Sequence, residues 1–379
     1  MIEKVYLDNA ATTRVDPNVV VVMTDCLRKN YGNPSSIHSF GRKSRALIEK
    51  SRRKIASLIN ASPSEIYFTS GGTEADNMAL RGAVRDAGVK NIITSKIEHP
   101  AVLNTAINLK KQGLISLHYV KLDDDGQVDL LNLESLLKKY KNTLVSLMHA
   151  NNEIGNLLPI NKVSKVCNKY GALFHCDTVQ TLAHLPIDVK LTPVDFIVCS
   201  AHKFHGPKGV GFLYVNNKIN ITPLIHGGSQ EKNMRGGTEY VYGIVGLAKA
   251  MEIAFSKMSL HHEHILNLKK HMILKLNSFL PEITFNGLSG DPTNSLYTVL
   301  SLSIPKFNNS DLLLFNLDLF GVACSGGSAC SSGSSKLSHV ISEISRKEEN
   351  VVVRFSFSKY NTIEEIDYVV EKLKYLLVQ

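Results

Sequence analysis

The chain has 379 residues, of which 44% are hydrophobic and 20% are charged, and its formal net charge at pH 7 is +9. This length suggests two domains, and the composition is that of a globular protein rather than a disordered one. No apolar run reaches the roughly 18–20 residues that a membrane-spanning helix needs. The first residues, MIEKVYLDNAATT, lack the apolar core of a secretory signal. The six cysteines form no C-x-x-C pair, which favours free thiols in a reducing compartment. We therefore expect a soluble, cytoplasmic protein.

The positive charge does not by itself indicate a nucleic-acid-binding protein. The basic residues are dispersed, and the densest run, RRK at 52–54, lies in a segment with helical periodicity. Nucleic-acid binding would require a basic stripe with interleaved aromatic residues, which we do not find. The charge is consistent with a solvated surface, or with steering of an acidic partner or anionic ligand. The histidines at 261, 262 and 264 do not meet a zinc-ligand pattern, so no metal site is predicted.

In chain order, the first two thirds of the sequence alternate helical patterns with short apolar runs. Apolar residues at helical spacing predict helices at 39–59, 101–113 and 161–171, the last of them closed by Gly171. Short apolar runs predict strands at 65–70, 91–95, 143–150, 172–177, 195–200 and 209–215. Strands that alternate with helices in this way predict a mainly parallel α/β sheet.

The pattern changes after about residue 250. A long helical stretch leads to apolar runs at 295–305 and 351–360, and the final helix opens at Thr362 with Glu365 three residues later. That pair is a capping-box signature. We predict two domains: a large domain at 15–255, and a smaller α+β domain formed by 1–14 and 256–379.

Two of the predicted strands are followed by residues suited to ligand binding. In an open α/β sheet the ligand lies beyond the carboxyl ends of the strands. Gly72 and Thr73 begin a helix after the strand at 65–70, and such a helix start offers N–H groups and a hydroxyl to an anion. A tight turn is the alternative interpretation. Asp177 ends another strand, and because a buried carboxylate is costly when unpaired, it needs a cationic partner from the protein or a ligand.

A third strand end carries a lysine. Ser200, His202 and Lys203 occupy the turn SAHKFHGPKG. Alone, this lysine would be an ordinary surface charge, and a lone His99 would be an ordinary surface or core histidine. Together with Asp177 and with the helix start at Gly72 and Thr73, which we call the anion cup, they match the needs of pyridoxal phosphate. This cofactor needs a lysine for its aldehyde, a carboxylate for its ring nitrogen, phosphate donors and a planar side chain over the ring.

Longer motifs reveal a family resemblance. They are YLDNAATT (6–13), GNPSSIHSFGR (32–42), TSGGTEADN (69–77), EHPAV (98–102), MHANNEIG (148–155), HCDTVQ (175–180), SAHKFHGPKG (200–209), HGGSQEKNMRGGT (226–238), GSACSSGS (327–334) and VRFSFSKYN (353–361). In this order and spacing, the chain resembles the NifS/IscS-type cysteine desulfurases over essentially its whole length. These are class V aminotransferase-like pyridoxal-phosphate enzymes of fold type I. The resemblance implies a mainly parallel seven-stranded sheet in the large domain.

The resemblance also implies a role for each matching residue. Lys203 matches the lysine that forms a Schiff base with the cofactor, Asp177 the partner of the ring nitrogen, and His99 the stacked acid–base histidine. The other matches are phosphate contacts (Gly72, Thr73, Ser200, His202), groups near the ring hydroxyl and the substrate (Gln180, Asn152), the substrate-carboxylate arginine (Arg354), and a phosphate contact from the second subunit of a homodimer (Thr238).

The stretch GSACSSGSS at 327–335 places Cys330 among small and polar residues. A thiol in such a polar, flexible loop is reachable. The resemblance implies that Lys203 shuttles the α-proton of L-cysteine and that Cys330 attacks its sulfur, leaving alanine and a persulfide. A sulfur-acceptor protein of iron–sulfur assembly or tRNA thiolation would then take the sulfur. A free thiol has a pKa of about 8.5, so attack by Cys330 at neutral pH needs a base or a nearby cation, and His99 is the candidate.

Several alternatives stay open at this point. The segment from Cys330 to Arg354 is a few residues shorter than in typical IscS-type members, which leaves the reach of the loop and the choice of acceptor undetermined. A selenocysteine lyase would use the same pocket. A silent sulfur-carrier or scaffold protein would have no need of Lys203 or Asp177, and an ordinary aminotransferase would have no use for a mobile thiol. We expect Cys324 to be a packed residue, with a resolving thiol as the alternative.

Overall fold

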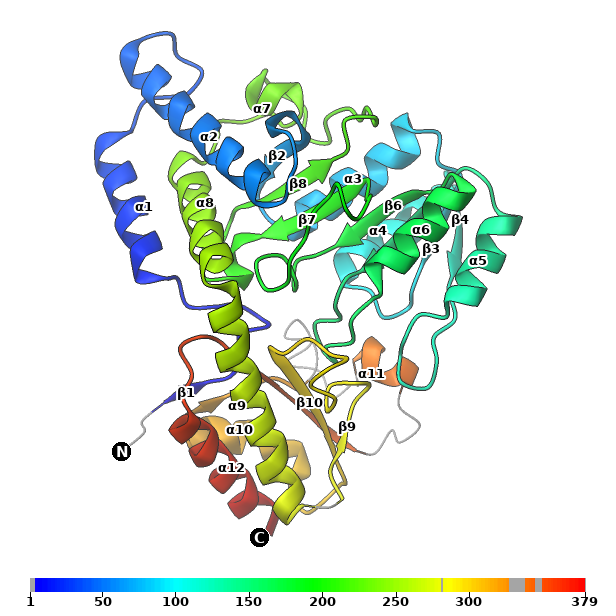
Figure 1. The fold of residues 1–379 in the computed structure, drawn as a ribbon, viewed down its shortest axis with the longest axis vertical. Coiled ribbons are helices and arrows are strands. Elements are labelled where there is room, and N and C mark those ends of the chain that lie inside the picture. Colours follow the sequence, from blue (N-terminus) through cyan, green and yellow to red (C-terminus); the bar gives the residue numbers. More distant parts are fainter. Residues whose placement is uncertain (1–3, 281, 327–337, 345–349, 379) are drawn as a thin grey trace.

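The computed structural model describes residues 4–280, 282–326, 338–344 and 350–378 (Figure 1). The predicted nucleophile Cys330 and its stretch 327–335 therefore lie outside the described residues. Two bodies are evident in Figure 1, a larger one built on a seven-stranded sheet and a smaller one below it. In the part of the chain that is described, no helix is both long and apolar enough to cross a membrane.

The larger sheet is mainly parallel, as predicted. Its strand order is β2-β8-β7-β6-β5-β3-β4, and only β8 runs antiparallel to its neighbours. The segment 201–210 between β7 and β8 is too short for the crossover that a parallel pair requires. The strands are β2 (Ile66–Thr69), β3 (Asn91–Thr94), β4 (Ser116–Tyr119), β5 (Thr143–Met148), β6 (Leu173–Asp177), β7 (Phe196–Ser200) and β8 (Gly211–Val215). The edge strand β4 was not predicted, because SLHY carries no continuous apolar run.

Helices cover both faces of this sheet, so successive residues of a central strand enter different cores. Along β7, Phe196 and Val198 pack with α3 and α4, whereas Ile197 and Cys199 pack with α2, α5, α6 and α8. The helices of this body are α1 (Pro17–Lys29), α2 (Ser39–Leu58), α3 (Gly72–Asp86), α4 (Pro100–Lys111), α5 (Leu130–Lys139), α6 (Ile160–Tyr170), α7 (Gln230–Asn233) and α8 (Val241–Ser256), with short 3₁₀ turns η1 (Pro63–Glu65) and η2 (Ala201–Lys203). Gly171 closes α6 in the left-handed conformation, as predicted.

The smaller body has its own apolar core. The strand β10 pairs antiparallel with β12 and β9, β1 pairs parallel with β11, and α9 and α12 pack together on one side. Its elements are β1 (Val5–Tyr6), α9 (Met258–Phe279), β9 (Thr284–Phe285), β10 (Val299–Ile304), η3 (Ser310–Leu312), α10 (Leu313–Leu319), β11 (Val322–Ala323), α11 (His339–Ile344), β12 (Val351–Ser356) and α12 (Ile363–Val378).

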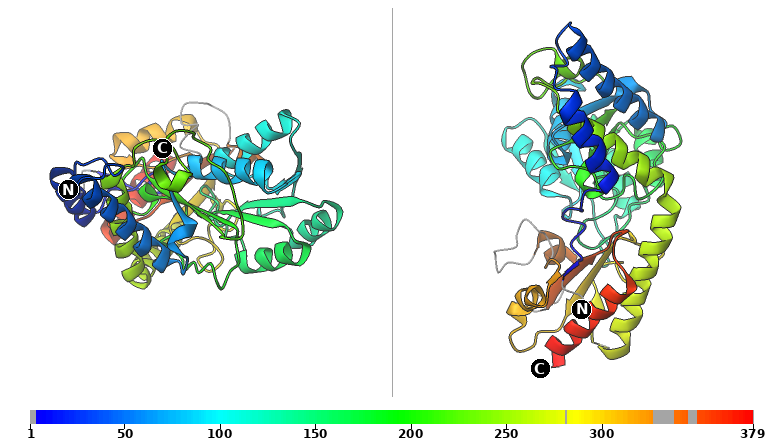
Figure 2. Two further views of the ribbon diagram at one scale, coloured as in Figure 1. Left: turned by 90° about the horizontal axis from the view of Figure 1, so that it is seen from above. Right: turned by 90° about the vertical axis from the view of Figure 1, so that its left-hand side faces the viewer.

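The α8–α9 junction links the two bodies. Residue 257 alone separates α8 from α9, and α9 runs down the side of the smaller body (Figure 2). The predicted capping box before α12 is confirmed, because Thr362 N donates to Glu365 Oε2 at 3.2 Å and Glu365 N to Thr362 Oγ1 at 3.3 Å. The domain boundaries at 14/15 and 255/256 stay a prediction.

A buried lysine in the smaller core gives its stability a characteristic pH dependence. Lys269 on α9 is fully buried, and its Nζ donates to Ser295 Oγ at 2.7 Å and to Leu296 O at 3.0 Å. Burial lowers the pKa of Lys269 to about 7, whereas an unfolded lysine keeps its proton to about pH 10.4. Between these values the unfolded state binds more protons, so the free energy of unfolding rises with pH.

We expect that free energy to rise by about 2 kcal/mol more between pH 7 and 9 in the wild type than in a Lys269→Met variant, at about 1.4 kcal/mol per pKa unit. Methionine has an unbranched side chain of similar shape but has no amine to titrate. Urea unfolding curves of both proteins at pH 6, 7, 8 and 9 would measure the difference. Parallel pH profiles for the two proteins would contradict the assignment.

Candidate active site

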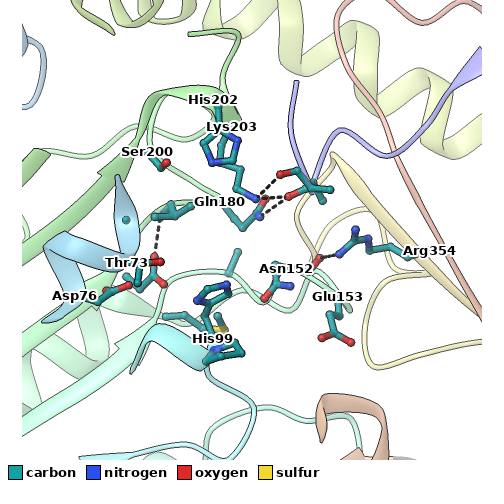
Figure 3. A pocket seen from close by; sticks show the side chains of 18 residues that line it. Thr73, Asp76, His99, Asn152, Glu153, Gln180, Ser200, His202, Lys203 and Arg354 are labelled. Carbon is teal, nitrogen blue, oxygen red and sulfur yellow. Dashed lines mark hydrogen bonds between the residues drawn. The ribbon is translucent and has the colours of Figure 1, made fainter. Parts of the chain in front are cut away.

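A cavity of about 290 Å³ opens at the carboxyl ends of the parallel strands (Figure 3). It brings together side chains from β6, β7, β12, the start of α3, and the loops before α4 and after β5. Among its lining residues are ten that the sequence predicted: Gly72, Thr73, His99, Asn152, Asp177, Gln180, Ser200, His202, Lys203 and Arg354. Residues more than 280 positions apart in the sequence thus converge in one cavity.

Lys203 ends the short turn η2, directly after β7. Its Nζ donates to Ala10 O at 2.6 Å and to Ala11 O at 2.9 Å, and Gln180 Nε2 also donates to Ala10 O at 3.0 Å. The N-terminal segment therefore forms one lip of the cavity with its backbone. Nothing in the residue type of an alanine indicates such a role, which explains why these two positions were not predicted.

The start of α3 forms an anion cup. No side chain caps this helix, so its first N–H groups, next to the Thr73 hydroxyl, are available to an anion, which the helix dipole also favours. A Cβ added at Gly72 would lie only 2.9 Å from Val179 Cγ2, so a larger residue would disturb the cup. Ser200 and His202 flank the cup from the end of β7. Burial lowers the pKa of His202 to about 4, so His202 is neutral at pH 7.

Asp177 is the last residue of β6 and is buried. Its Oδ1 accepts a hydrogen bond from Val179 N at 2.9 Å. Burial raises the pKa of Asp177, whereas His99 and Lys203 oppose that rise. His99 caps α4, and its Nδ1 accepts from Ala101 N at 3.1 Å, which assigns the ring proton of the neutral form to Nε2. Burial also lowers the pKa of His99. A cationic ligand atom beside Asp177 would complete the stabilisation of its charge.

Two further polar residues lie near Asp177, and the sequence analysis missed both: Asp76 lines the cavity, and His175 precedes Asp177 on β6. Asp76 Oδ1 and His175 Nε2 lie 3.3 Å apart, both fully buried, yet their geometry gives neither atom a hydrogen bond. Burial, then Asp177 and Glu98, raise the pKa of Asp76, and burial lowers the pKa of His175 to about 3. Asp76 lies one helical turn after Thr73, so helical periodicity could have placed it at the cavity.

Arg354 on β12 lies on the opposite side of the cavity. Its Nη2 lies 2.8 Å from Asp8 Oδ1, and its Nη1 donates to Asn152 O at 2.9 Å. Its side chain is 1% exposed, and its Nε has no hydrogen-bond partner. A buried donor without a partner is costly. Because the planar guanidinium group suits a carboxylate, a carboxylate ligand in the cavity would satisfy it.

The remaining predicted residues lie elsewhere. Thr238 lines a separate small cavity with Gly237 and Glu239. Cys324 follows β11, packs against the smaller core and is partly buried, and burial raises the pKa of its thiol to about 12. This environment agrees with the expected packed residue. No group of His, Cys, Asp or Glu residues that could hold a metal occurs in the described ranges.

Comparison with known proteins identifies the class and then the group within it. The model of the aminotransferase class-V family matches residues 5–369. The chain therefore belongs to this family of pyridoxal-phosphate enzymes. Within the family it belongs to the cysteine desulfurases. A cysteine desulfurase IscS from Dictyoglomus turgidum is 44% identical over 382 residues, which cover 100% of this chain and 95% of that protein.

Solved structures of related proteins agree with this family assignment. A NifS-like protein superposes with a TM-score of 0.90 at 38% identity and 99% coverage of both chains. A structure of SspA in complex with cysteine superposes with a TM-score of 0.79 at 32% identity, covering 94% of this chain and 99% of that one. The family resemblance and the fold class read from the sequence are thus confirmed.

Proposed function

We propose that this protein is a cysteine desulfurase that converts L-cysteine to L-alanine and holds the sulfur as a persulfide on Cys330. The observation that carries the proposal is the convergence of Lys203, Asp177 and Arg354 in one cavity. A silent scaffold protein would not need an amine, a buried acid and a carboxylate-binding arginine in this arrangement. The sulfur then passes to an acceptor protein, for iron–sulfur cluster assembly or tRNA thiolation.

The cavity fits pyridoxal phosphate. The uncapped start of α3, with Thr73, Ser200 and His202, would hold the phosphate, and the buried Asp177 would hold a protonated ring nitrogen. Lys203 would hold the aldehyde carbon, His99 would stack on the ring and Gln180 would lie near its hydroxyl. When bound, this cofactor supplies an electron sink that acidifies the α-proton of an amino acid.

The residues of the chain would then perform the following steps. Arg354 holds the carboxylate of L-cysteine, helped by Asn152, and Lys203 Nζ takes the proton from Cα and returns it later. The Cys330 thiolate attacks the substrate sulfur, so that an S–S bond forms while the C–S bond breaks. The electron pair of the broken bond passes to the β-carbon, which gains a proton and becomes the methyl group of alanine. His99 is positioned near Lys203 and Asp177 and is our candidate for removing the thiol proton of Cys330.

We propose that the active form is a homodimer. Thr238 matches a phosphate contact of the family, yet it lines a different cavity from the other phosphate residues of its own chain. A second copy of the chain could supply the missing contact. This separation supports the homodimer, in which each subunit donates Thr238 to the site of the other.

The role of Arg354 tests the substrate side of the proposal. An Arg354→Lys variant is expected to bind L-cysteine roughly 10- to 100-fold more weakly, because it loses the two-pronged carboxylate contact, and hydrogen bonds to charged groups contribute about 1.5–3 kcal/mol. Apparent dissociation constants follow from the change in the cofactor absorbance on titration. Cysteamine, which has the thiol and amine but no carboxylate, is the control ligand. An equal loss for both ligands, or none for L-cysteine, would contradict the role.

A further inference from the structure

The segment that leads to Thr238 has an unusual backbone. Glu231, Lys232 and Asn233 in α7 have φ angles of 43°, 57° and 65°. Consecutive left-handed residues are costly for side chains other than glycine. Such a conformation persists only where the surroundings hold it in place. In Figure 1, α7 lies beside α2 and β2 at the upper end of the larger body, so the contacts that hold it should come from these elements.

A buried ion pair provides the first of these contacts. The side chains of Arg52 on α2 and Glu231 on α7 are 1% and 2% exposed. They form a bidentate ion pair, in which Arg52 Nη1 lies 2.5 Å from Glu231 Oε1 and Arg52 Nη2 lies 3.0 Å from Glu231 Oε2. The Arg52 guanidinium also lies 4.7 Å from the centre of the Phe68 ring. This pair therefore fixes the first left-handed residue to the body of the protein.

The same pair also completes the edge of the sheet. β2 is an edge strand, and such a strand leaves backbone groups without a partner. Arg52 Nη1 donates to Ile66 O at 2.7 Å, and Phe68 N donates to Glu231 Oε1 at 2.7 Å. Arg52 and Glu231 thus occupy the place of a neighbouring strand. The position of Arg52 and Glu231 is therefore set by β2, and the end of β2 leads into the anion cup.

A second ion pair joins the segment to the cup itself. Arg235 Nε donates to Glu74 Oε1 at 3.0 Å, and Glu74 Oε2 accepts from Ser70 N at 3.0 Å. Glu74 lies in the first turn of α3, beside Thr73. Thr238 follows Arg235 by three residues. The left-handed turn is therefore attached at its start, through Glu231, to α2 and β2, and two residues after its end, through Arg235, to the first turn of α3, which forms the anion cup.

We infer that Arg52 and Glu231 are positioning residues that fix Thr238 for the cofactor phosphate of a second copy of the chain. This inference rests on the homodimer proposed above and deepens it. Because β2 leads into the anion cup and its backbone hydrogen-bonds to both members of the ion pair, the Thr238 that a subunit donates is held in register with the cup that the subunit keeps. The two cofactor sites of the dimer would then share one rigid frame.

The test uses an Arg52→Met/Glu231→Leu double variant. Removing only one partner would leave a buried charge and endanger folding, whereas replacing both partners of a buried ion pair with apolar residues of similar volume is often neutral or stabilising. We expect the double variant to remain a dimer by light scattering, yet to bind pyridoxal phosphate about tenfold more weakly when the apoprotein is titrated. Lys54→Met/Glu252→Leu is the matched control, because it removes an exposed ion pair between α2, the helix of Arg52, and α8, and it should bind the cofactor like the wild type.

A comparison with Thr238→Ala separates positioning from a general loss of structure. Thr238→Ala alone should lower the affinity for pyridoxal phosphate about as much as the double variant does. Combining all three changes should lower the affinity little further, because both variants remove the same contact. Additive losses, or wild-type affinity in the double variant, would overturn the inference while leaving the proposed function in place. A wild-type protein that is monomeric with cofactor bound would overturn both the inference and the homodimer. Failure of the wild type to bind the cofactor would overturn the proposed function as well.

Discussion

A Lys203→Ala variant is expected to form alanine from L-cysteine at least about 10³-fold more slowly than the wild type, because positioned acid–base groups contribute about 10²–10⁴-fold and this lysine also binds the cofactor covalently. Its Nζ lies at the lip of the cavity, held by two backbone carbonyls. Without the amine, the cofactor would be retained only by non-covalent contacts. Dialysis should therefore remove the cofactor from the variant and not from the wild type.

Lys218→Ala is the matched control for this prediction. Lys218 is an exposed lysine that follows β8, so its removal also deletes one positive charge and leaves the anion cup and the Nζ of Lys203 in place. The control should retain activity within about threefold, as surface substitutions usually change little. If Lys203→Ala stayed within tenfold of the wild type, the proposed role of this amine would be wrong.

The second large effect is expected at Cys330. Cys330→Ser should release no sulfide from L-cysteine above background, because a serine hydroxyl does not ionise at neutral pH and cannot hold a persulfide. The variant should still bind L-cysteine, seen as a change in the cofactor absorbance, because Arg354 and Lys203 remain. Assays of alanine and sulfide on one sample would measure the loss.

Cys324→Ser is the control for Cys330→Ser. The Cys324 thiol packs against the smaller core, and burial raises its pKa to about 12, so we expect sulfide release within about threefold of the wild type, as for a residue outside the chemistry. If Cys330→Ser still released sulfide and Cys324→Ser did not, the nucleophile would be Cys324, and the proposed role of Cys330 would be wrong.

Much of this site could be predicted because the fold places it by a general rule. Parallel strands present their carboxyl ends at one edge, so Asp177 and Ser200, each the last residue of a strand, were found by reading strand ends. The reversal of β8 was not anticipated, because its direction depends on the length of the connection after β7 rather than on its own apolar residues.

Other parts of the site left no signal in residue type. Ala10 and Ala11 act through carbonyl oxygens, which every residue possesses. The Arg52–Glu231 pair joins positions 179 residues apart, so only the folded chain shows that they meet. Asp76 is the exception, since its spacing from Thr73 placed it on the cavity side of α3, and a helical-wheel argument would have found it.

The most direct test of the desulfurase assignment is an absorbance spectrum of the purified protein before and after addition of L-cysteine, with alanine and sulfide assayed on the same sample. The account predicts a near-visible cofactor band that changes on addition of L-cysteine, together with alanine and sulfide in a reducing buffer in equal amounts. A protein that stays colourless and inert after pyridoxal phosphate is supplied would contradict it, and would mean that the fold is present without its chemistry.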